Sequence, residues 1–245
     1  MKVDFHVHTN RSIDAIHSPR AMVKMAKKTG LDAIAITDHN HLFPAAEAKR
    51  LSAEFGIVVI PGIEGGNIAV RKHWIALGIS SQVTGIIIDE ILASIRNDSG
   101  VSIAPHPHTR LGYDNYADCG FDAVESLNGS EPICNRRIRN LRNIPEVAGS
   151  DAHAIPMLGF CWTEVDADAS TESILESIRR GCCRPAGTTI PFLRLISFYS
   201  LYLRYRVLVD PIAAFRATCD VIQDIRRVRA VESSCRNCRT YQCPR

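Results

Sequence analysis

Histidines and acidic residues recur along this chain in short motifs of the kind that bind metal ions. The motifs are DFHVHTN at 4–10, TDHN at 37–40, PGIEGG at 61–66, PHPH at 105–108 and GSDAH at 149–153. A further histidine, His73, follows the third motif. Imidazole nitrogens and carboxylate oxygens without thiolates are typical ligands of zinc, manganese or iron. The residue types therefore predict a divalent metal site.

The spacing within two of these motifs predicts how their side chains point. Residues two apart in a β-strand lie on the same face of the sheet. His6 and His8 have this spacing, and so do Asp151 and His153. Each pair is therefore expected to present two ligands to one place.

The motifs follow apolar, β-branched runs that alternate with helical patterns. The runs, which we predict as strands, are 3–7, 33–37, 57–60, 73–79, 101–104, 123–127, 146–148 and 159–165. Among the predicted helices, SPRAMVKMAKK at 18–28 has a serine cap and a proline at its first position. This alternation predicts an α/β fold of parallel β/α units, closed into a barrel over residues 1–189.

In such a barrel the C-terminal ends of the strands meet at one mouth, so ligands far apart in sequence can form one ring. A set of nine candidates exceeds what one ion needs and predicts two to three ions. A lone histidine at a strand end is more often a hydrogen-bonded structural residue, and we interpret His17 and His41 in this way.

Taken in order and spacing, these motifs resemble the polymerase and histidinol phosphatase (PHP) domain family. The resemblance covers roughly residues 1–190. It implies a distorted (β/α)7 TIM-like barrel with a trinuclear metal site that hydrolyses phosphoesters. It is closest to the stand-alone branch of the family, which includes 5′-3′ exonucleases and nucleoside-bisphosphate phosphatases.

The resemblance also assigns metal ligands residue by residue. These are His6, His8, Asp14, His39, Glu64, His73, His106, Asp151 and His153. It implies that Glu64 bridges two ions. The family's first loop often reads SDG where this chain reads SIDA, so the match of Asp14 depends on an insertion-tolerant loop.

Phosphoester hydrolysis needs an activated water and neutralised phosphate oxygens, and clustered divalent metals supply both. The expected reaction is attack by a metal-activated hydroxide near Glu64. Asp38 is predicted to orient a ligand histidine or to carry a proton, with helix capping as the alternative. His108 is predicted to contact the substrate or to orient His106.

Other residues are candidates for lining the pocket. Arg11, Arg136 and Arg137 could bind substrate phosphates bidentately, although each also fits a solvated surface arginine. Glu125 and Asn128, at the end of the sixth predicted strand, fit either a pocket-lining or a structural role.

The predicted function is a metal-dependent phosphoesterase acting on nucleotides or nucleic-acid ends, for example a 5′-3′ exonuclease. A small-molecule phosphatase of the histidinol-phosphatase type is an alternative. A non-catalytic barrel that binds RNA or protein is another, which the full ligand set disfavours. An amide-bond hydrolase is a third, although no strand-end lysine of the kind used by amidohydrolase barrels is present.

The C-terminal part of the chain differs in composition. Residues 190–232 are predicted as a helical extension and 233–245 as a flexible, Cys/Arg-rich tail. The tail cysteines, at 235, 238 and 243, fit either a zinc site or, as we prefer, reduced thiols. The apolar segment 190–209 carries arginines that argue against a membrane span. A helix packed on the domain or at a homodimer interface is the preferred role, and a membrane-surface helix is the alternative.

Net charge and cysteine content constrain partners and location. A net charge of +3 gives no strong case, by bulk electrostatics, for a nucleic-acid or membrane partner. The first residues, MKVDFHVH, do not resemble a signal peptide, and most of the nine cysteines lack regular spacing. These features predict a cytoplasmic protein with reduced thiols and no transmembrane segment.

Overall fold

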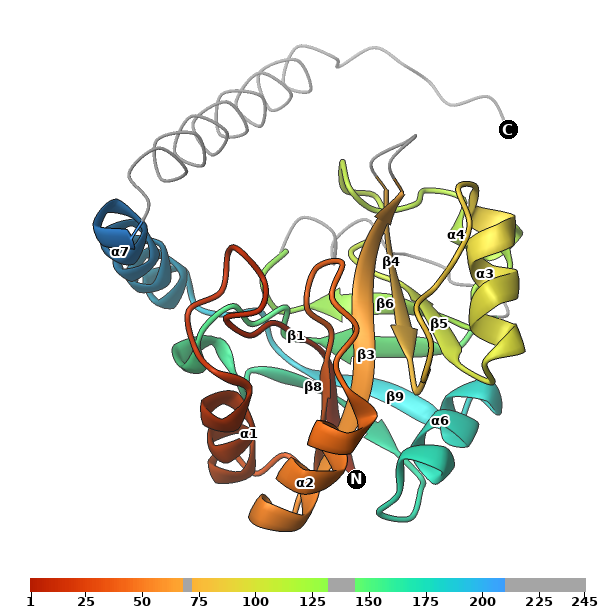
Figure 1. Cartoon of the computed structure of the whole chain (residues 1–245), viewed down its shortest axis with the longest axis horizontal. Coiled ribbons are helices and arrows are strands. Elements are labelled where there is room, and N and C mark those ends of the chain that lie inside the picture. The colour runs from red at the N-terminus through yellow and green to blue at the C-terminus, as the bar shows by residue number, and fades with distance from the viewer. Residues whose placement is uncertain (68–71, 132–143, 210–245) are drawn as a thin grey trace, which may run out of the picture. The chain divides into compact units, whose positions relative to one another are not determined.

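The structure is a computed structural model that describes residues 1–67, 72–131 and 144–209. A nine-stranded sheet organises this part of the chain (Figure 1). The strands are β1 (Lys2–Val7), β2 (Ala33–Ile36), β3 (Val58–Asn67), β4 (Lys72–Leu77), β5 (Val101–Ala104), β6 (Ala123–Asn128), β7 (Glu146–Gly149), β8 (Cys161–Val165) and β9 (Cys183–Gly187). The helices are α1 (Pro19–Lys28), α2 (Ala45–Phe55), α3 (Ile88–Asn97), α4 (Tyr116–Cys119), η1 (Ile155–Met157), α6 (Thr171–Arg179) and α7 (Phe192–Val209).

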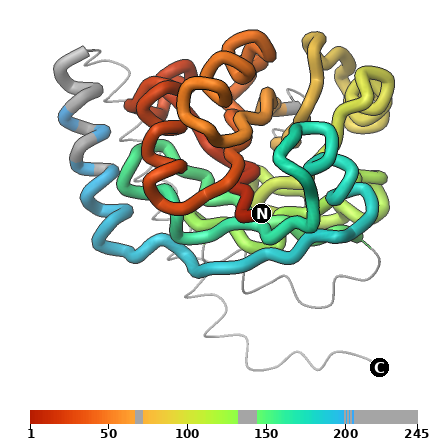
Figure 2. Tube along the Cα trace, turned by 90° about the horizontal axis from the view of Figure 1, so that it is seen from below, coloured from red at the N-terminus to blue at the C-terminus, as the bar shows by residue number. Residues whose placement is uncertain are grey.

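The sheet curls so that the segment after β7, the strand at one end of the sheet, forms hydrogen bonds with the β1 region. The strand order is β7-β6-β5-β4-β3-β2-β1-β8-β9. Figure 2 shows the chain turned by 90° from Figure 1, with the N-terminus, just before β1, near the middle of the view. The Asp151 N–H donates to the His6 carbonyl at 2.8 Å, and the His8 N–H donates to the Ala152 carbonyl at 3.0 Å. These bonds nearly close the sheet, which confirms the predicted distorted α/β barrel.

Two strands, β4 and β8, break the expected series of parallel β/α units. Strands β1 to β3 are parallel to one another, and so are β5 to β7. By contrast, β4 is antiparallel to both of its neighbours, and β8 is antiparallel to β1 and β9. Only four residues separate Asn67 from Lys72, too few for the crossover that a parallel pair needs. Edge strand β9 was not expected from the sequence, because Pro185 is unfavourable inside a sheet.

Helix α1 begins and ends where the sequence predicts. The Ser18 side chain accepts a hydrogen bond from the Ala21 N–H at 3.3 Å, and Pro19 opens α1. Helix α2 ends at Gly56, whose φ of 61° is the left-handed conformation that glycine adopts most easily. Short loops therefore join α1 to β2 and α2 to β3.

Buried apolar side chains fill two clusters. The first draws residues from each of strands β1 to β8, for example Val3 and Phe5, and adds Ile174 and Ile178 from α6. The second packs α3 and the α4 region against β3 to β6. These clusters form the apolar core, and the polar candidate residues lie at the ends of the strands outside it.

The described C-terminal region consists mainly of helix α7. The chain divides into two units, Met1–Phe198 and Tyr199–Arg245, and helix α7 starts close to the predicted boundary at residue 190. The tail cysteines lie outside the described residues. Within those residues no helix combines the length and apolarity that a membrane crossing requires. The domain boundaries, the homodimer contact and the cytoplasmic location stay predictions.

Candidate metal centre

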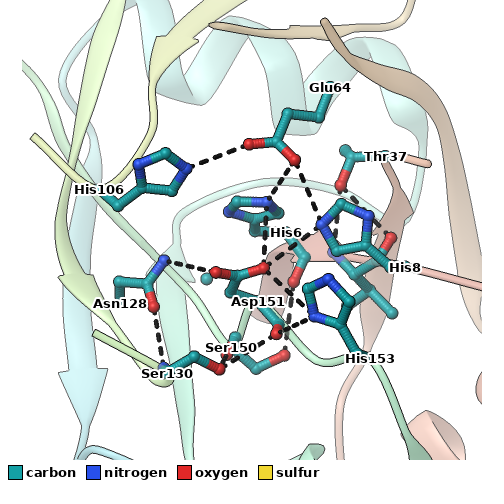
Figure 3. A network of polar contacts seen from close by, with 12 residues as sticks. His6, His8, Thr37, Glu64, His106, Asn128, Ser130, Ser150, Asp151 and His153 are labelled. Carbon is teal, nitrogen blue, oxygen red and sulfur yellow. Dashed lines mark hydrogen bonds and ion pairs between the residues drawn. The ribbon is translucent and has the colours of Figure 1, made fainter. Parts of the chain in front are cut away.

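All nine predicted ligands meet in one cluster, which we call the centre (Figure 3 shows part of it). On one side of the centre, Asp14 contacts His39 and His153. These two histidines contact Glu64 and Asp151, which connect them to the other ligands, His6, His8, His73 and His106. His73 reaches it because β4 runs antiparallel to β3, which places the start of β4 beside the end of β3, opposite Gly66. The chain direction of β4 thus supplies a ligand that a parallel strand would have placed at the other end.

Glu64 occupies the middle of the centre, and its carboxylate is 1% exposed. Its Oε1 lies 2.8 Å from His73 Nδ1 and 3.1 Å from His106 Nε2. Its Oε2 faces the remaining partners, with contacts of 2.9 Å to His39 Nδ1, 3.4 Å to His8 Nε2 and 3.5 Å to His6 Nε2. One carboxylate therefore connects five imidazoles that come from four different strand ends.

His6 and His8 each direct Nε2 at carboxylate oxygens without forming a hydrogen bond through that atom. Both side chains are fully buried, and among the described residues neither Nε2 atom has a hydrogen-bond partner. Each lies 3.3–3.5 Å from Asp151 Oδ1 and from Glu64 Oε2. Buried, unpartnered nitrogens beside carboxylates are costly unless a cation lies between them. The residues present therefore fit a divalent metal ion.

Asp14 forms the exposed side of the centre. Its Oδ2 lies 3.2 Å from His39 Nε2 and 3.3 Å from His153 Nε2. The carboxyl is 36% exposed, whereas the imidazole of His8 is fully buried. The structure thus brings Asp14 to the other candidates despite its unusual loop sequence, and solvent reaches the centre from this side.

Burial and charge oppose one another at the carboxylates. Burial raises the pKa of Glu64, but His39 and His6 outweigh it and hold that pKa well below its usual value. Burial likewise raises the pKa of Asp14 and of Asp151, and neighbouring histidines again bring both well below the usual range. The carboxylates are therefore ionised at neutral pH, as metal ligands must be.

The histidines respond to the same charges in opposite ways. Burial, with His153 and His39 nearby, lowers the pKa of His8 to about 3. Burial also lowers the pKa of His39, but Glu64 and Asp14 outweigh it and raise that pKa to about 11. For His153, Asp14 and Asp151 overcome burial and raise the pKa to about 9. Without metal, protons on these outer histidines balance the carboxylate charge.

Two candidate ligands have unusual backbone conformations. Asp151 has a φ of 52° and His106 a φ of 31°, in a region that non-glycine residues adopt at a cost. Gly149, at the end of β7, leaves no room for a side chain, since a Cβ there would lie 2.3 Å from the Cβ of His6. The chain is thus shaped closely around the centre.

Comparison with known proteins identifies the family. The PHP domain model matches residues 4–116, and the PHP-associated model matches residues 135–183. An uncharacterized protein of Methanocaldococcus jannaschii is 34% identical over 143 residues, which cover 52% of this chain and 82% of that protein. The chain belongs to the PHP domain family.

Two further matches are longer than this chain. A PolC-type DNA polymerase III of Lactococcus lactis is 45% identical over 157 residues, covering 60% of this chain but 10% of the polymerase. A crystal structure from Bacteroides vulgatus, a two-domain protein containing a predicted PHP-like metal-dependent phosphoesterase, matches with a TM-score of 0.60 and 19% identity. That match covers 77% of this chain and 65% of the other. At this identity it shows a shared fold.

Glu125 supports the PHP centre from behind, where the sequence left its role open. Its Oε1 lies 3.0 Å from His6 Nδ1, and its Oε2 accepts hydrogen bonds of 2.8 Å from the His106 N–H and from Asn128 Nδ2. A carboxylate behind a ligand histidine fixes the ring and its tautomer. Asn128 Nδ2 also lies 3.4 Å from Asp151 Oδ2.

Replacing Glu125 by Gln should therefore weaken metal binding by about 10–100-fold, because the amide cannot accept from His6 and Asn128 as the carboxylate does. The measurement is a metal titration of chelator-treated protein by calorimetry. Glu146→Gln, on the neighbouring strand β7, is the control and should bind as the wild type does. Equal affinity in Glu125→Gln and wild type would contradict the assignment.

The remaining predicted site residues lie at different distances from the ligands. The Asp38 carboxylate is fully buried and accepts from the Thr9 N–H at 2.5 Å and from the Thr9 hydroxyl at 2.7 Å, so it organises the first loop. The His108 Nδ1 lies 3.1 Å from Asp114 Oδ1, and its ring meets Tyr116 edge-on. The catalytic roles of Asp38 and His108 stay predictions.

Of the three predicted phosphate-binding arginines, Arg11 lies within the described residues. The Arg11 guanidinium pairs with Glu47 at 2.5 Å and lies over the Phe43 ring, 4.9 Å from its centroid. Arg136 and Arg137 lie outside the described residues. Their roles stay predictions.

Proposed function

We propose that this chain is a metal-dependent phosphoesterase that hydrolyses phosphate esters of nucleotides or nucleic-acid ends. The observation that carries this proposal is the meeting of nine histidine and carboxylate side chains at one end of the barrel. Within the described part of the chain, the Nε2 atoms of His6 and His8 have no hydrogen-bond partner and lie beside Asp151. The matched segment of a DNA polymerase supports the choice of nucleotide substrates.

Three overlapping sets of ligand atoms, each within 4.8 Å of one another, support a centre of two to three zinc, manganese or iron ions. The sets are His8 with His39 and His153, His6 with His8 and Asp151, and His39 with Glu64 and His73. Such ions, when bound, lower the pKa of water towards neutrality and neutralise phosphate oxygens. The protein's part is to hold ionised carboxylates and neutral imidazoles in fixed positions.

Substrate approach is proposed from the exposed side, formed by Asp14 and His39, because the inner ligands are buried. His108, 27% exposed beside Asp114, is proposed to contact the bound ester. Arg11 is proposed to exchange its pairing with Glu47 for a substrate phosphate. Glu64, held ionised, keeps the five histidines around it in place.

A substrate panel tests the proposal, with metal-loaded protein offered mononucleotides, nucleoside bisphosphates, end-labelled oligonucleotides, histidinol phosphate and an aryl phosphate ester. We expect phosphate or nucleotide release from the nucleotide substrates, lost in His8→Ala. His41→Ala is the control, because His41 is an exposed histidine beside the second motif.

Other outcomes would redirect or overturn the proposal. Turnover of histidinol phosphate alone would establish the small-molecule alternative in place of nucleotide substrates. Metal binding without turnover of any ester would contradict an enzymatic function and favour a binding protein.

A further inference from the structure

One buried hydroxyl connects the first two motifs. The Ser12 side chain, 2% exposed, accepts a hydrogen bond of 2.8 Å from the His39 backbone N–H. The same oxygen lies 3.0 Å from Asp38 Oδ1 and 3.2 Å from His8 Nδ1. Ser12 thus contacts the His8 ring, the Asp38 carboxylate and the backbone of His39 at once.

A serine hydroxyl has one proton to donate, and its neighbours decide where that proton points. The His39 backbone N–H can only donate, so it takes a lone pair of Ser12. Asp38 already accepts from the Thr9 N–H and hydroxyl, and an ionised carboxylate can only accept. The Ser12 proton therefore goes to Asp38.

His8 is the remaining neighbour, and it must then donate to Ser12 from Nδ1. A neutral imidazole has one N–H, so His8 Nε2 carries the lone pair. That Nε2 lies 3.3 Å from Asp151 Oδ1 and 3.4 Å from Glu64 Oε2. The ring is thus fixed with its acceptor nitrogen inside the centre, in the form that binds a metal ion.

We propose that Ser12 is a positioning residue that fixes His8 in its Nδ1–H tautomer and joins the first-motif and second-motif ligands into one rigid unit. His6 carries a hydrogen on Nδ1 for a more direct reason, because Glu125 Oε1, 3.0 Å away, belongs to a carboxylate that accepts. Without the Ser12 hydroxyl, the proton of His8 would move to Nε2, where Glu64 and Asp151 offer acceptor oxygens. This inference rests on the proposed metal function for its consequence, but not for the tautomer itself.

The test compares Ser12→Ala with Ser12→Thr, which keeps the hydroxyl. Ser102→Ala is the matched control, since Ser102 donates to Asp122 at 2.7 Å and accepts from the Asp122 N–H at 3.1 Å with no histidine involved. One readout is the nitrogen NMR spectrum of the His8 ring in metal-free protein at neutral pH. The other is the affinity for manganese or zinc by calorimetric titration.

The wild type and Ser12→Thr should show the His8 proton on Nδ1, and Ser12→Ala should move it to Nε2. Metal affinity should fall by about 10–100-fold in Ser12→Ala and recover in Ser12→Thr. The melting temperature of each metal-free variant checks that it folds. If Ser12→Thr does not fold, the ring spectra of wild type and Ser12→Ala decide alone.

A wild-type His8 protonated on Nε2, or ring spectra and affinities unchanged in folded Ser12→Ala, would overturn the role of Ser12. A wild type that binds no metal would overturn the proposed metal centre, while the ring spectra would still decide the tautomer. The two failures are therefore distinguishable.

Discussion

Replacing Glu64 by Gln should reduce metal-dependent phosphoester hydrolysis by about a thousandfold. This corresponds to about 4 kcal/mol of lost transition-state stabilisation, as expected when bound metal ions are lost or displaced. Glu64 has this effect because each of its oxygens contacts histidines of different strands, and an amide offers only one acceptor oxygen. The measurement is kcat/KM for an aryl phosphate ester with saturating metal, together with the metal content of the variant.

The matched control is Glu164→Gln, which removes a strand glutamate that pairs with Arg184 far from the centre. This variant should retain wild-type kcat/KM and metal content. Full activity in Glu64→Gln, with the metal content of the wild type, would contradict the central position of Glu64.

In metal-free protein, the free energy of unfolding should decrease as pH rises above 6.5. The folded-state pKa of His153, about 9, and that of His39, about 11, both exceed the ordinary value of 6.5. A raised histidine pKa gives stability that is fully present below the unfolded value and lost as pH rises through the folded value. The carboxylate pKa values are lowered, so their contribution changes only below about pH 5.

Metal-loaded protein should behave in the opposite way. Ligand histidines must be deprotonated to bind, so metal binding becomes stronger as pH rises. The melting temperatures of loaded and chelator-treated protein should therefore diverge between pH 6.5 and 9. Each kcal/mol of difference corresponds to about 2–4 °C for a chain of this size.

The melting curves need one control and have one contradictory outcome. His41→Ala should show the wild-type pH dependence, because His41 lies outside the centre. A metal-free melting temperature that stays constant or rises from pH 6.5 to 9 would show that protons on His39 and His153 do not balance the carboxylates.

The sequence predicted which side chains lie together in the centre, because their positions follow a rule of local geometry. His6 and His8 were expected to share a face from their spacing, and both meet Glu64 and Asp151 in the structure. Asp14 reached the centre despite the SIDA loop. Strand ends in a barrel converge, so residue type and position after a strand were enough to bring together the candidate set.

What the sequence did not predict depends on contacts between distant segments. The antiparallel direction of β4 follows from the short connection between β3 and β4, and the preceding residue pattern does not predict that connection. The irregular register of β1 against β2 between Asp4 and Val7 is likewise a feature of pairing. The support from Ser12 and Glu125 arises from partners in other motifs, and single loop serines and strand-end glutamates carry no such signal on their own.

The most direct test of the metal centre is elemental analysis of wild-type protein purified without added metal, combined with circular dichroism of the same sample. We expect two to three divalent ions per folded chain, removed by chelation and restored by manganese, zinc or iron. Folded wild-type protein that contains no divalent ion, and takes up none on titration, would contradict the account.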